Sequence, residues 1–316
     1  MQEVTIIIPN FNGIAYIEHC LNSLRKQTVS NFNVIVVDNG SKDASKALVS
    51  NCYTEVELIA LDDNYGFSRA VNEGIAHADT PYVILLNNDT EVEEAFVEEL
   101  LKAIKRSPKI FSCSAKMLDF YKRNVIDDAG DLYCALGWAL ARGKGRKDKY
   151  YQDYTKIFAA CAGAAIYRKE IFEQIGMFDE RHFAYLEDID IGYRARIYGY
   201  ENRYTPTARV FHVGSGTTGA RYSKAKVGLA ARNNIYVIYK NMPIPQILLN
   251  LPFLLLGLLL KQLFFVKKRM GCAYFVGICK GLTLCRQEFK IKFTLCHLKN
   301  YIKIQIELWN NIWLRT

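Results

Sequence analysis

An apolar run that stops abruptly at two amides and a carboxylate constrains the fold of this chain more than any other stretch. Residues Val83 to Leu86 are too few for a buried helix and show no alternation, so they predict a central strand of a parallel sheet covered on both faces. Asn87, Asn88 and Asp89 follow at the carboxyl end of that strand. Ligands of open α/β sheets bind at this edge, where an acidic residue can hold a hard divalent cation that bridges phosphate oxygens.

The same three residues also have a purely structural interpretation. Asn and Asp are common turn and cap formers, so they could simply turn the chain and cap a helix that starts near Glu91. From this stretch alone the two interpretations stay open.

Three earlier segments repeat the pattern of a buried strand followed by a polar cluster. The strands are expected at Val4 to Ile8, Val34 to Val37 and Val56 to Leu61. The clusters that follow them are 10–13, 38–41 and 62–67. Helical stripes at 17–27, around 48–49 and at 70–76 separate the strands, so the pattern predicts a doubly wound α/β sheet with polar residues along one edge.

Three classes of nucleotide-binding protein do not fit this pattern. There is no GxGxxG after the first strand, as the usual dinucleotide fold requires, and no GxxxxGK[ST] phosphate loop. Sugar-1-phosphate nucleotidyltransferases would be expected to carry a Gly-rich loop with a basic residue after the first strand, whereas this loop offers only Gly13.

A second acidic stretch lies at Glu187, Asp188 and Asp190. The spacing of Ile189, Tyr193 and Ile197 predicts a helix whose first turn carries these three acids. Acids in a first turn often only complement the helix dipole. Three acids exceed what a cap needs, so we favour the alternative that one of them is a general base.

His212 ends a strand expected at Thr205 to Phe211 and precedes a Gly-rich turn at 214–219. A lone histidine is usually structural, but one at a strand end is also a candidate metal ligand, and both interpretations stay open. The basic stretch Arg142 to Lys149 predicts a solvated loop, with binding of an acceptor's phosphate groups as the alternative.

The positive charge of the chain is concentrated at its C-terminal end. Of 41 Lys and Arg and 32 Asp and Glu, eleven basic and two acidic residues lie from Lys261 onward, which leaves 30 of each before it. The stretch Ile247 to Val266 is about long enough to span a bilayer but contains Asn250, Pro252, Lys261 and Gln262. This composition favours a helix lying in the plane of an anionic membrane, or a helical hairpin. A packing unit, a dimer interface and a nucleic-acid-binding tail are the alternatives.

The cysteines and the N-terminus bear on location. The nine cysteines include no CxxC pair, so we expect neither a zinc site nor a disulfide framework. A reducing compartment is therefore expected. Residues 1–10 lack a charged segment and a long apolar core, so no signal peptide is expected. Together with the tail, this predicts a protein at the cytoplasmic face of the cell membrane, peripheral or monotopic.

Several of these stretches, in this order, resemble family 2 glycosyltransferases of the GT-A fold, especially the rhamnosyltransferase-like branch. The resemblance spans roughly residues 4–235. It is carried by Ile7-Ile-Pro-Asn-Phe-Asn-Gly13, Val37-Asp-Asn-Gly-Ser41, Asn64-Tyr-Gly-Phe67 with Asn72-Glu-Gly74, Leu86-Asn-Asn-Asp89, Gly176-Met-Phe-Asp-Glu180, Glu187-Asp188 and His212.

The resemblance implies six residues that bind the nucleotide of the donor: Pro9, Asn12, Asp38, Asn64, Gly66 and Asn87. Pro9 and Asn12 would line the pocket, Asp38 would hydrogen-bond a pyrimidine base, and Asn64 and Gly66 would shape the ribose and phosphate side.

The resemblance also implies the catalytic and metal-binding residues. Asp89 would be the metal-binding last acid of a DxD-type motif that here reads Asn-Asn-Asp, and His212 would be a possible further ligand to Mg²⁺ or Mn²⁺. Asp188, beside Glu187, would be the catalytic base.

We therefore expect a mixed, doubly wound GT-A-type sheet flanked by helices at 1–240, and a hydrophobic, basic, membrane-associating helical tail at 241–316. The expected activity is inverting transfer of a sugar, with rhamnose as the first candidate, from a dTDP- or UDP-linked donor to a glycan or polyprenyl-linked acceptor. The alternative is a noncatalytic nucleotide-sugar-binding or assembly protein at the membrane. No nucleic-acid partner is expected.

Overall fold

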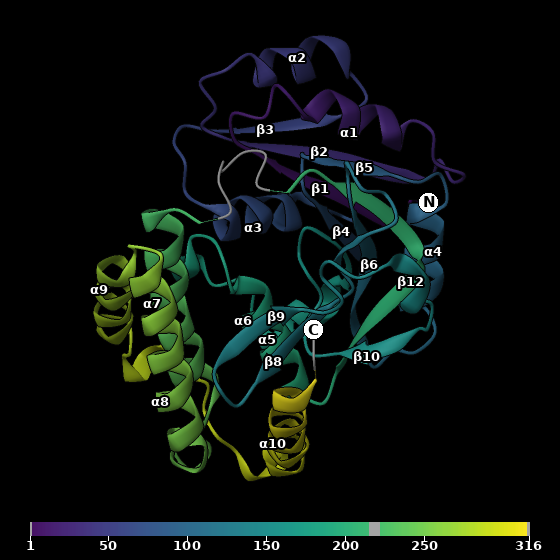
Figure 1. Cartoon of the computed structure of the whole chain (residues 1–316). Helices are drawn as coiled ribbons and strands as arrows, with labels where there is room; N and C mark the ends of the chain where they lie inside the picture. Colours follow the sequence, from purple (N-terminus) through teal and green to yellow (C-terminus); the bar gives the residue numbers. More distant parts are fainter. Residues whose placement is uncertain (1, 215–221, 315–316) are drawn as a thin grey trace.

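The computed structural model describes residues 2–214 and 222–314, and its N-terminal part is an alternating β/α unit (Figure 1). Its elements are β1 Val4–Asn10, α1 Ile17–Leu24, β2 Phe32–Asn39, α2 Ser45–Cys52, β3 Glu57–Leu61, α3 Phe67–His77 and β4 Tyr82–Leu86. The four strands are parallel in the order β4-β1-β2-β3. Their carboxyl ends therefore meet at one edge, as the sequence predicted.

Beyond β4 the sheet becomes mixed. The added elements are β5 Thr90–Val92, α4 Phe96–Ile104, β6 Ile110–Asp119, β7 Ile126–Asp128, β10 Thr155–Ile157, β11 Ala164–Arg168, α5 Lys169–Ile175 and β12 Glu201–His212. Strand β11 lies antiparallel between β4 and β6, and β12 runs parallel to β6. The full order is β10-β12-β6-β11-β4-β1-β2-β3, with β5 paired to β12 and β7 to β6.

Helices cover both faces of the sheet. Residues of α1, α2 and α4 form one buried apolar cluster with the strands, and residues of α3, α5 and α6 (Glu187–Ile197) form another on the opposite face. Because both faces are covered, the central strands are apolar without alternation: Val83 to Leu86 are fully buried. The mixed α/β fold class expected from the sequence is thereby confirmed.

The remaining elements lie beside the sheet, and most of them share a third core. They are the hairpin β8 Asp131–Cys134 and β9 Trp138–Ala141, and the helices α7 Lys224–Asn241, α8 Ile244–Lys267, α9 Gly271–Thr283 and α10 Leu298–Trp313. Side chains of β8, α6, α7, α8 and α10 share this core, which includes Tyr133, Tyr193 and Leu308. Figure 1 shows α7, α8 and α9 as a bundle on the side of the molecule away from β3.

One local interpretation was wrong. Residues 90–92 form the strand β5 and not the start of a helix, because they pair with β12 through Glu91 and Phe211. Helix α5 ends at Ile175, where Gly176 adopts a φ of 80° that glycine tolerates.

Candidate active site

The loops after β1 and β2 are tied together by buried polar side chains. Asp38 is fully buried, and its two carboxylate oxygens accept hydrogen bonds from Asn10 Nδ2 at 2.9 Å and from the backbone N–H of Ser41 at 3.0 Å. Asn12 accepts a hydrogen bond from the backbone N–H of Lys42 at 2.8 Å. In this structure Asp38 thus organises the two loops, and its expected contact to a nucleotide base stays a prediction.

Asn10 is a residue whose importance the sequence reasoning missed. Besides Asp38, its side chain donates to Ser45 Oγ at 2.9 Å and accepts from Asn88 Nδ2 at 2.7 Å. It therefore joins the ends of β1, β2 and β4. Gly13 makes this possible, because a Cβ at that position would overlap Asn88 Nδ2 and Asn10 Oδ1.

The loops after β3 and β4 are similarly organised. Asn64 Oδ1 accepts hydrogen bonds from Asn39 Nδ2 at 3.1 Å and from the N–H of Gly66 at 3.0 Å. Gly66 is the residue directly before α3. Gly66 has a φ of 86°, a backbone conformation that glycine adopts without strain. Asn87 is fixed by its N–H, which donates to the carbonyl of Gly163 at 2.8 Å. Pro9, one residue before the end of β1, pairs with Val37. The six expected nucleotide residues thus lie at strand ends of one edge.

Asp89 and His212 lie together although 123 positions separate them in the sequence. His212 Nε2 is 3.3 Å from Asp89 Oδ1, and His212 Nδ1 is 2.8 Å from Asp127 Oδ2. Burial favours the neutral imidazole, but the hydrogen bonds to Asp127 and Asp89 outweigh it and raise the pKa of His212 to about 9. Asp127 also forms an ion pair with Lys144 at 2.5 Å. Residues 215–221, most of the Gly-rich turn expected after His212, lie outside the described part of the chain.

With the proton of His212 lost, this group would be a candidate site for a divalent cation. A carboxylate and an imidazole nitrogen face one another, and the second ring nitrogen is held by a carboxylate, which is the usual way in which a metal-binding histidine is oriented. An oxygen and nitrogen donor set of this kind suits Mn²⁺ or Mg²⁺ with water and phosphate as the other ligands.

Asp188 belongs to a second, carboxyl-rich group. Its neighbours are Asp131, which begins β8, Asp128, which ends β7, and Glu187. Burial, and then the charges of Asp128 and Asp188, raise the pKa of Asp131 well above its usual range. Burial and the charge of Asp188 raise the pKa of Glu187 to about 8. Both shifts favour the protonated form of the Asp131 and Glu187 carboxyl groups.

Asp188 is the acceptor within this group. Burial raises its pKa, while the backbone N–H of Ile189 and the protonated carboxyl of Asp131 both donate hydrogen bonds to it and oppose that rise. A carboxylate that is partly desolvated but held by two donors is a suitable general base, because its position is fixed and its proton affinity is increased.

The short strand β7 connects the two groups. Asp127 contacts His212. Burial, and then the charges of Asp127 and Asp188, raise the pKa of the next residue, Asp128, to about 7. Sequence reasoning missed Asp127, Asp128 and Asp131. Three aspartates within five residues around Gly130 were the available signal.

The segment before Glu187 and Asp188 has an unusual backbone. Phe183, Tyr185 and Leu186 have φ values of 62°, 73° and 66°, which side chains with a Cβ rarely adopt. The fully buried Asn233 of α7 holds this segment, with Nδ2 at 2.8 Å from the carbonyl oxygens of His182, Ala184 and Tyr185. Such strain persists only where surrounding structure enforces it, and is frequent at functional sites.

Asp190, the third acid of this turn, is separate from the other two. It is fully buried and forms ion pairs with Lys240 at 2.9 Å and Arg194 at 2.9 Å, while Asp179 contacts the same Lys240 at 2.6 Å. The side chains of Asp179, His182 and Asp190 lie close enough together for a metal ion, but Lys240 already supplies the positive charge. The structure therefore gives Asp190 a packing role.

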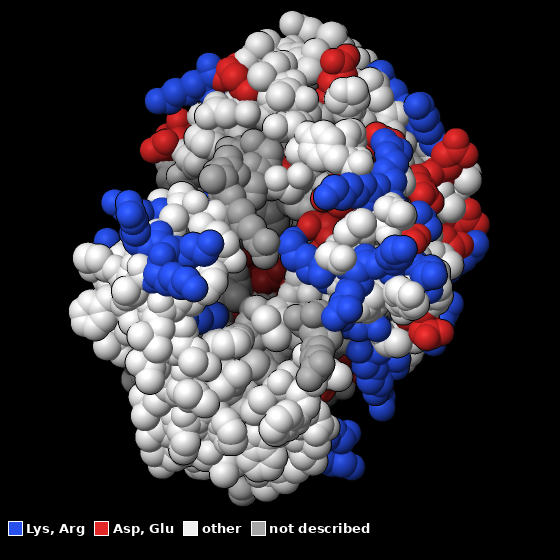
Figure 2. Space-filling view, in the orientation of Figure 1, with Lys and Arg blue, Asp and Glu red and all other residues white. Residues whose placement is uncertain are grey.

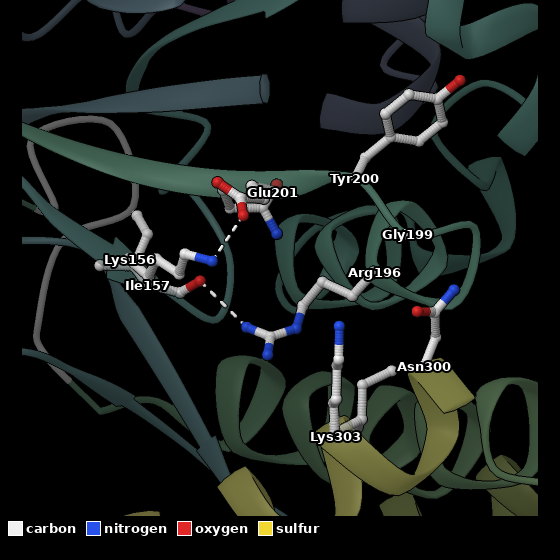
Figure 3. Close-up of a pocket in the computed structure, with 10 residues that line it drawn as sticks. Lys156, Ile157, Arg196, Gly199, Tyr200, Glu201, Asn300 and Lys303 are labelled. Atoms are coloured by element: carbon white, nitrogen blue, oxygen red, sulfur yellow. Dashed lines mark hydrogen bonds and ion pairs between the residues drawn. The ribbon is translucent and has the colours of Figure 1, made fainter. Parts of the chain in front are cut away.

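Two hollows were found, and only the first borders one of these groups. One of about 200 Å³ borders Asp89 and is lined by Tyr16, His19, Phe120 and Tyr121. The other, of about 110 Å³, is lined by Lys156, Arg196 and Lys303 (Figure 3). Lys156 and Arg196 are already paired with Glu201 and Glu307, and this hollow lies at the opposite end of α6 from Asp188. Figure 2 shows acidic side chains at the floor of the central hollow.

Comparisons of sequence agree with this geometry. Residues 5–176, more than half of the chain, match the family described as Glycosyl transferase family 2. The N-acetylglucosaminyl-diphospho-decaprenol L-rhamnosyltransferase of Mycobacterium tuberculosis is 27% identical over 239 residues, which cover 68% of this chain and 77% of that protein. The teichoic acid poly(glycerol phosphate) polymerase of Staphylococcus epidermidis is 35% identical over 96 residues, covering 29% of this chain and 13% of the polymerase.

Solved structures show the fold. GalNAc-T7 with UDP, GalNAc and Mn²⁺ superimposes with a TM-score of 0.61 at 16% identity, covering 75% of this chain and 48% of that one. The mannosyltransferase PcManGT of Pyrobaculum calidifontis with GDP-Man and Mn²⁺ gives 0.58 at 17% identity, covering 89% and 87%. With a GT-A-type sheet and a family match over its N-terminal half, the chain belongs to glycosyl transferase family 2, where it resembles the rhamnosyltransferases.

Proposed function

We propose that this protein is an inverting glycosyltransferase of cell-surface polysaccharide synthesis. It moves a sugar, with rhamnose as the first candidate, from a dTDP- or UDP-linked donor to a hydroxyl of a glycan or of a saccharide linked to a polyprenyl diphosphate. The donor sugar follows the rhamnosyltransferase to which the chain is similar. The observation that carries the proposal is the position of β7, whose adjacent residues Asp127 and Asp128 contact the Asp89–His212 pair and the Asp188 group respectively.

The Asp89–His212 pair marks the part of the active site that is proposed to bind the diphosphate of the donor. Asp89 and His212 would hold Mg²⁺ or Mn²⁺, and a bound ion of this kind stabilises the negative charge that develops on a departing pyrophosphate oxygen. Asp127 keeps His212 in the orientation in which Nε2 faces Asp89.

Asp188 is the proposed base at the acceptor end. It accepts the proton of the acceptor hydroxyl as the oxygen forms its bond to the anomeric carbon and the bond to the diphosphate oxygen breaks. With the base and the leaving group at separate ends of the site, the attack occurs opposite the leaving group, so a single displacement inverts the configuration. Asp131 fixes the carboxylate by donating a hydrogen bond to it.

The donor site is tested by thermal unfolding of the full chain with UDP, dTDP or GDP, each with and without Mn²⁺. A nucleotide at about one hundred times its Kd adds roughly 2.7 kcal/mol to the free energy of unfolding, which is several degrees of Tm. We expect one nucleotide to give a metal-dependent shift that Asp89→Ala abolishes and that substitution of the exposed Asp153 by Ala leaves in place. Absence of a shift with every nucleotide would contradict the donor site.

We further propose that α8 lies in the plane of a membrane and does not cross it. The helix has 24 residues and is long and apolar enough to span. One stripe is buried against the protein over the first half of the helix, at Gln246, Asn250, Leu254 and Gly257. Asn250 hydrogen-bonds Gln305 of α10 at 2.8 Å, so a spanning helix would have to separate from α10. The opposite side of α8 exposes many leucines. In Figure 2 the lower part of the molecule, where Figure 1 places α8, carries almost no charged side chains.

Native cysteines distinguish the two arrangements. Cys52, in the sheet domain, and Cys296, after α8 and α9, are both exposed. In inside-out membrane vesicles we expect a membrane-impermeant thiol reagent to label both residues, because an in-plane α8 keeps them on the cytoplasmic side. Labelling of only one of them until detergent is added would show that α8 spans the bilayer. Cys52→Ser and Cys296→Ser identify the modified sites.

A further inference from the structure

Helix α8 packs closely against the β8–β9 hairpin, and Lys261 is the lysine of α8 that lies next to this contact. One helical turn earlier, a Cβ at Gly257 would overlap the carbonyl oxygen of Leu136, and Trp138 Nε1 donates a hydrogen bond to the Gly257 carbonyl at 3.1 Å. The Lys261 amine follows on the same side of the helix, with Nζ 5.6 Å from the centre of the Trp138 ring.

No carboxylate among the described residues pairs with this amine. Within 2–214 and 222–314 it forms no ion pair, and the remaining residues of the chain include no Asp or Glu. Burial lowers its pKa to about 8, which still leaves it largely charged at neutral pH. A partly buried cation without a counterion is unfavourable, so an anionic ligand would be stabilised here.

The hairpin fixes the position of Lys261 relative to the base. Asp131, the hydrogen-bond partner of Asp188, pairs with Ala141 at one end, and Cys134 pairs with Trp138 at the other. Three residues along a strand correspond to about 10 Å. This length is comparable to one sugar residue followed by a diphosphate. On either side of Lys261 in the sequence, α8 exposes Leu259, Leu260 and Leu263.

We propose that Lys261 binds the diphosphate that joins the acceptor saccharide to its lipid. The acceptor hydroxyl then lies at Asp188, the saccharide follows the hairpin, and the polyprenyl chain leaves over the apolar side of α8. The inference rests on the proposed function for the lipid-linked nature of the acceptor. It adds the residue that would distinguish a diphosphate-linked acceptor from an uncharged glycoside.

The test measures equilibrium binding of farnesyl diphosphate and of farnesol to the full chain in neutral detergent. EDTA is present, so that no cation holds the diphosphate at Asp89. Lys261→Met keeps the length and apolar stem of the side chain and removes the charge. We expect it to weaken farnesyl diphosphate binding about 10- to 100-fold while farnesol binding and the Tm stay unchanged. Lys268→Met, at an exposed lysine after the same helix, should change neither affinity more than about twofold.

Two results would overturn the inference. Equal binding of farnesyl diphosphate by wild type and Lys261→Met would show that the amine only packs against Trp138. Equal losses in Lys261→Met and Lys268→Met would show diffuse attraction to the basic end of α8. The metal-dependent nucleotide shift is measured on the same Lys261→Met protein. If that shift persists while the diphosphate affinity is unaltered, the donor proposal stands and only the Lys261 inference fails.

Discussion

Asp188→Asn is expected to lower kcat about 10²- to 10⁴-fold, the usual contribution of a positioned general base. Asn keeps the shape of the side chain and can still contact Asp131 and the N–H of Ile189, but it cannot take the hydroxyl proton. The proposed donor site meets β7 at Asp127 and does not include Asp188, so the metal-dependent nucleotide shift in Tm should persist. Steady-state kinetics of sugar transfer, together with that Tm shift, provide the measurement.

Glu187→Gln is the matched control for this substitution. Glu187 is buried with a pKa raised to about 8, so at neutral pH it is already mainly uncharged and Gln resembles it closely. We expect a much smaller loss of kcat than for Asp188→Asn. Full turnover by Asp188→Asn would show that Asp188 is not the base. Unchanged cellular function in a variant that transfers no sugar would instead favour the noncatalytic nucleotide-sugar-binding protein.

Asp190→Asn is expected to destabilise the protein by about 3–5 kcal/mol, the typical cost of removing one partner from a buried ion pair. Asp190 is fully buried, and its carboxylate accepts hydrogen bonds from Lys240 at 2.9 Å, Arg194 at 3.0 Å and Asn241 at 2.8 Å. The neutral amide would leave two buried cations with less negative charge. Urea unfolding followed by circular dichroism gives the change in free energy. The exposed Asp153→Asn should stay within about 0.5 kcal/mol of wild type.

The same network predicts how stability depends on pH. Lys240 and the other partners of Asp179 and Asp190 outweigh burial and lower both pKa values, that of Asp179 from 3.8 to about 2. A carboxylate whose pKa falls on folding stabilises the protein above its unfolded pKa, and this contribution is lost as pH falls toward the folded pKa. We therefore expect stability to decline from about pH 4 toward pH 2, and to decline less steeply in Asp190→Asn. An equally steep decline would show that Asp190 is not ionised in the folded protein.

Much of the parallel half-sheet was predictable because its signals are local. Apolar runs such as 83–86 that end in Asn and Asp specify buried strands with polar carboxyl ends, and the acids of 187–190 specify the start of a helix. The short strands β5 and β7 were not predictable, because three residues show no periodicity and become strands only by pairing with β12 and β6.

By itself, the sequence determined which polar residues stand at strand and helix ends, because the limits of a buried apolar segment depend on its own residues. Tertiary structure decided which of them meet. Asp131 reaches Asp188, and His212 reaches Asp89, only because β8 and β12 return to the sheet edge. It also separated Asp190 from Asp188 by placing Lys240 beside one of them. Contacts between distant segments depend on how whole elements pack against one another, and nothing in the local spacing of residues encodes that arrangement.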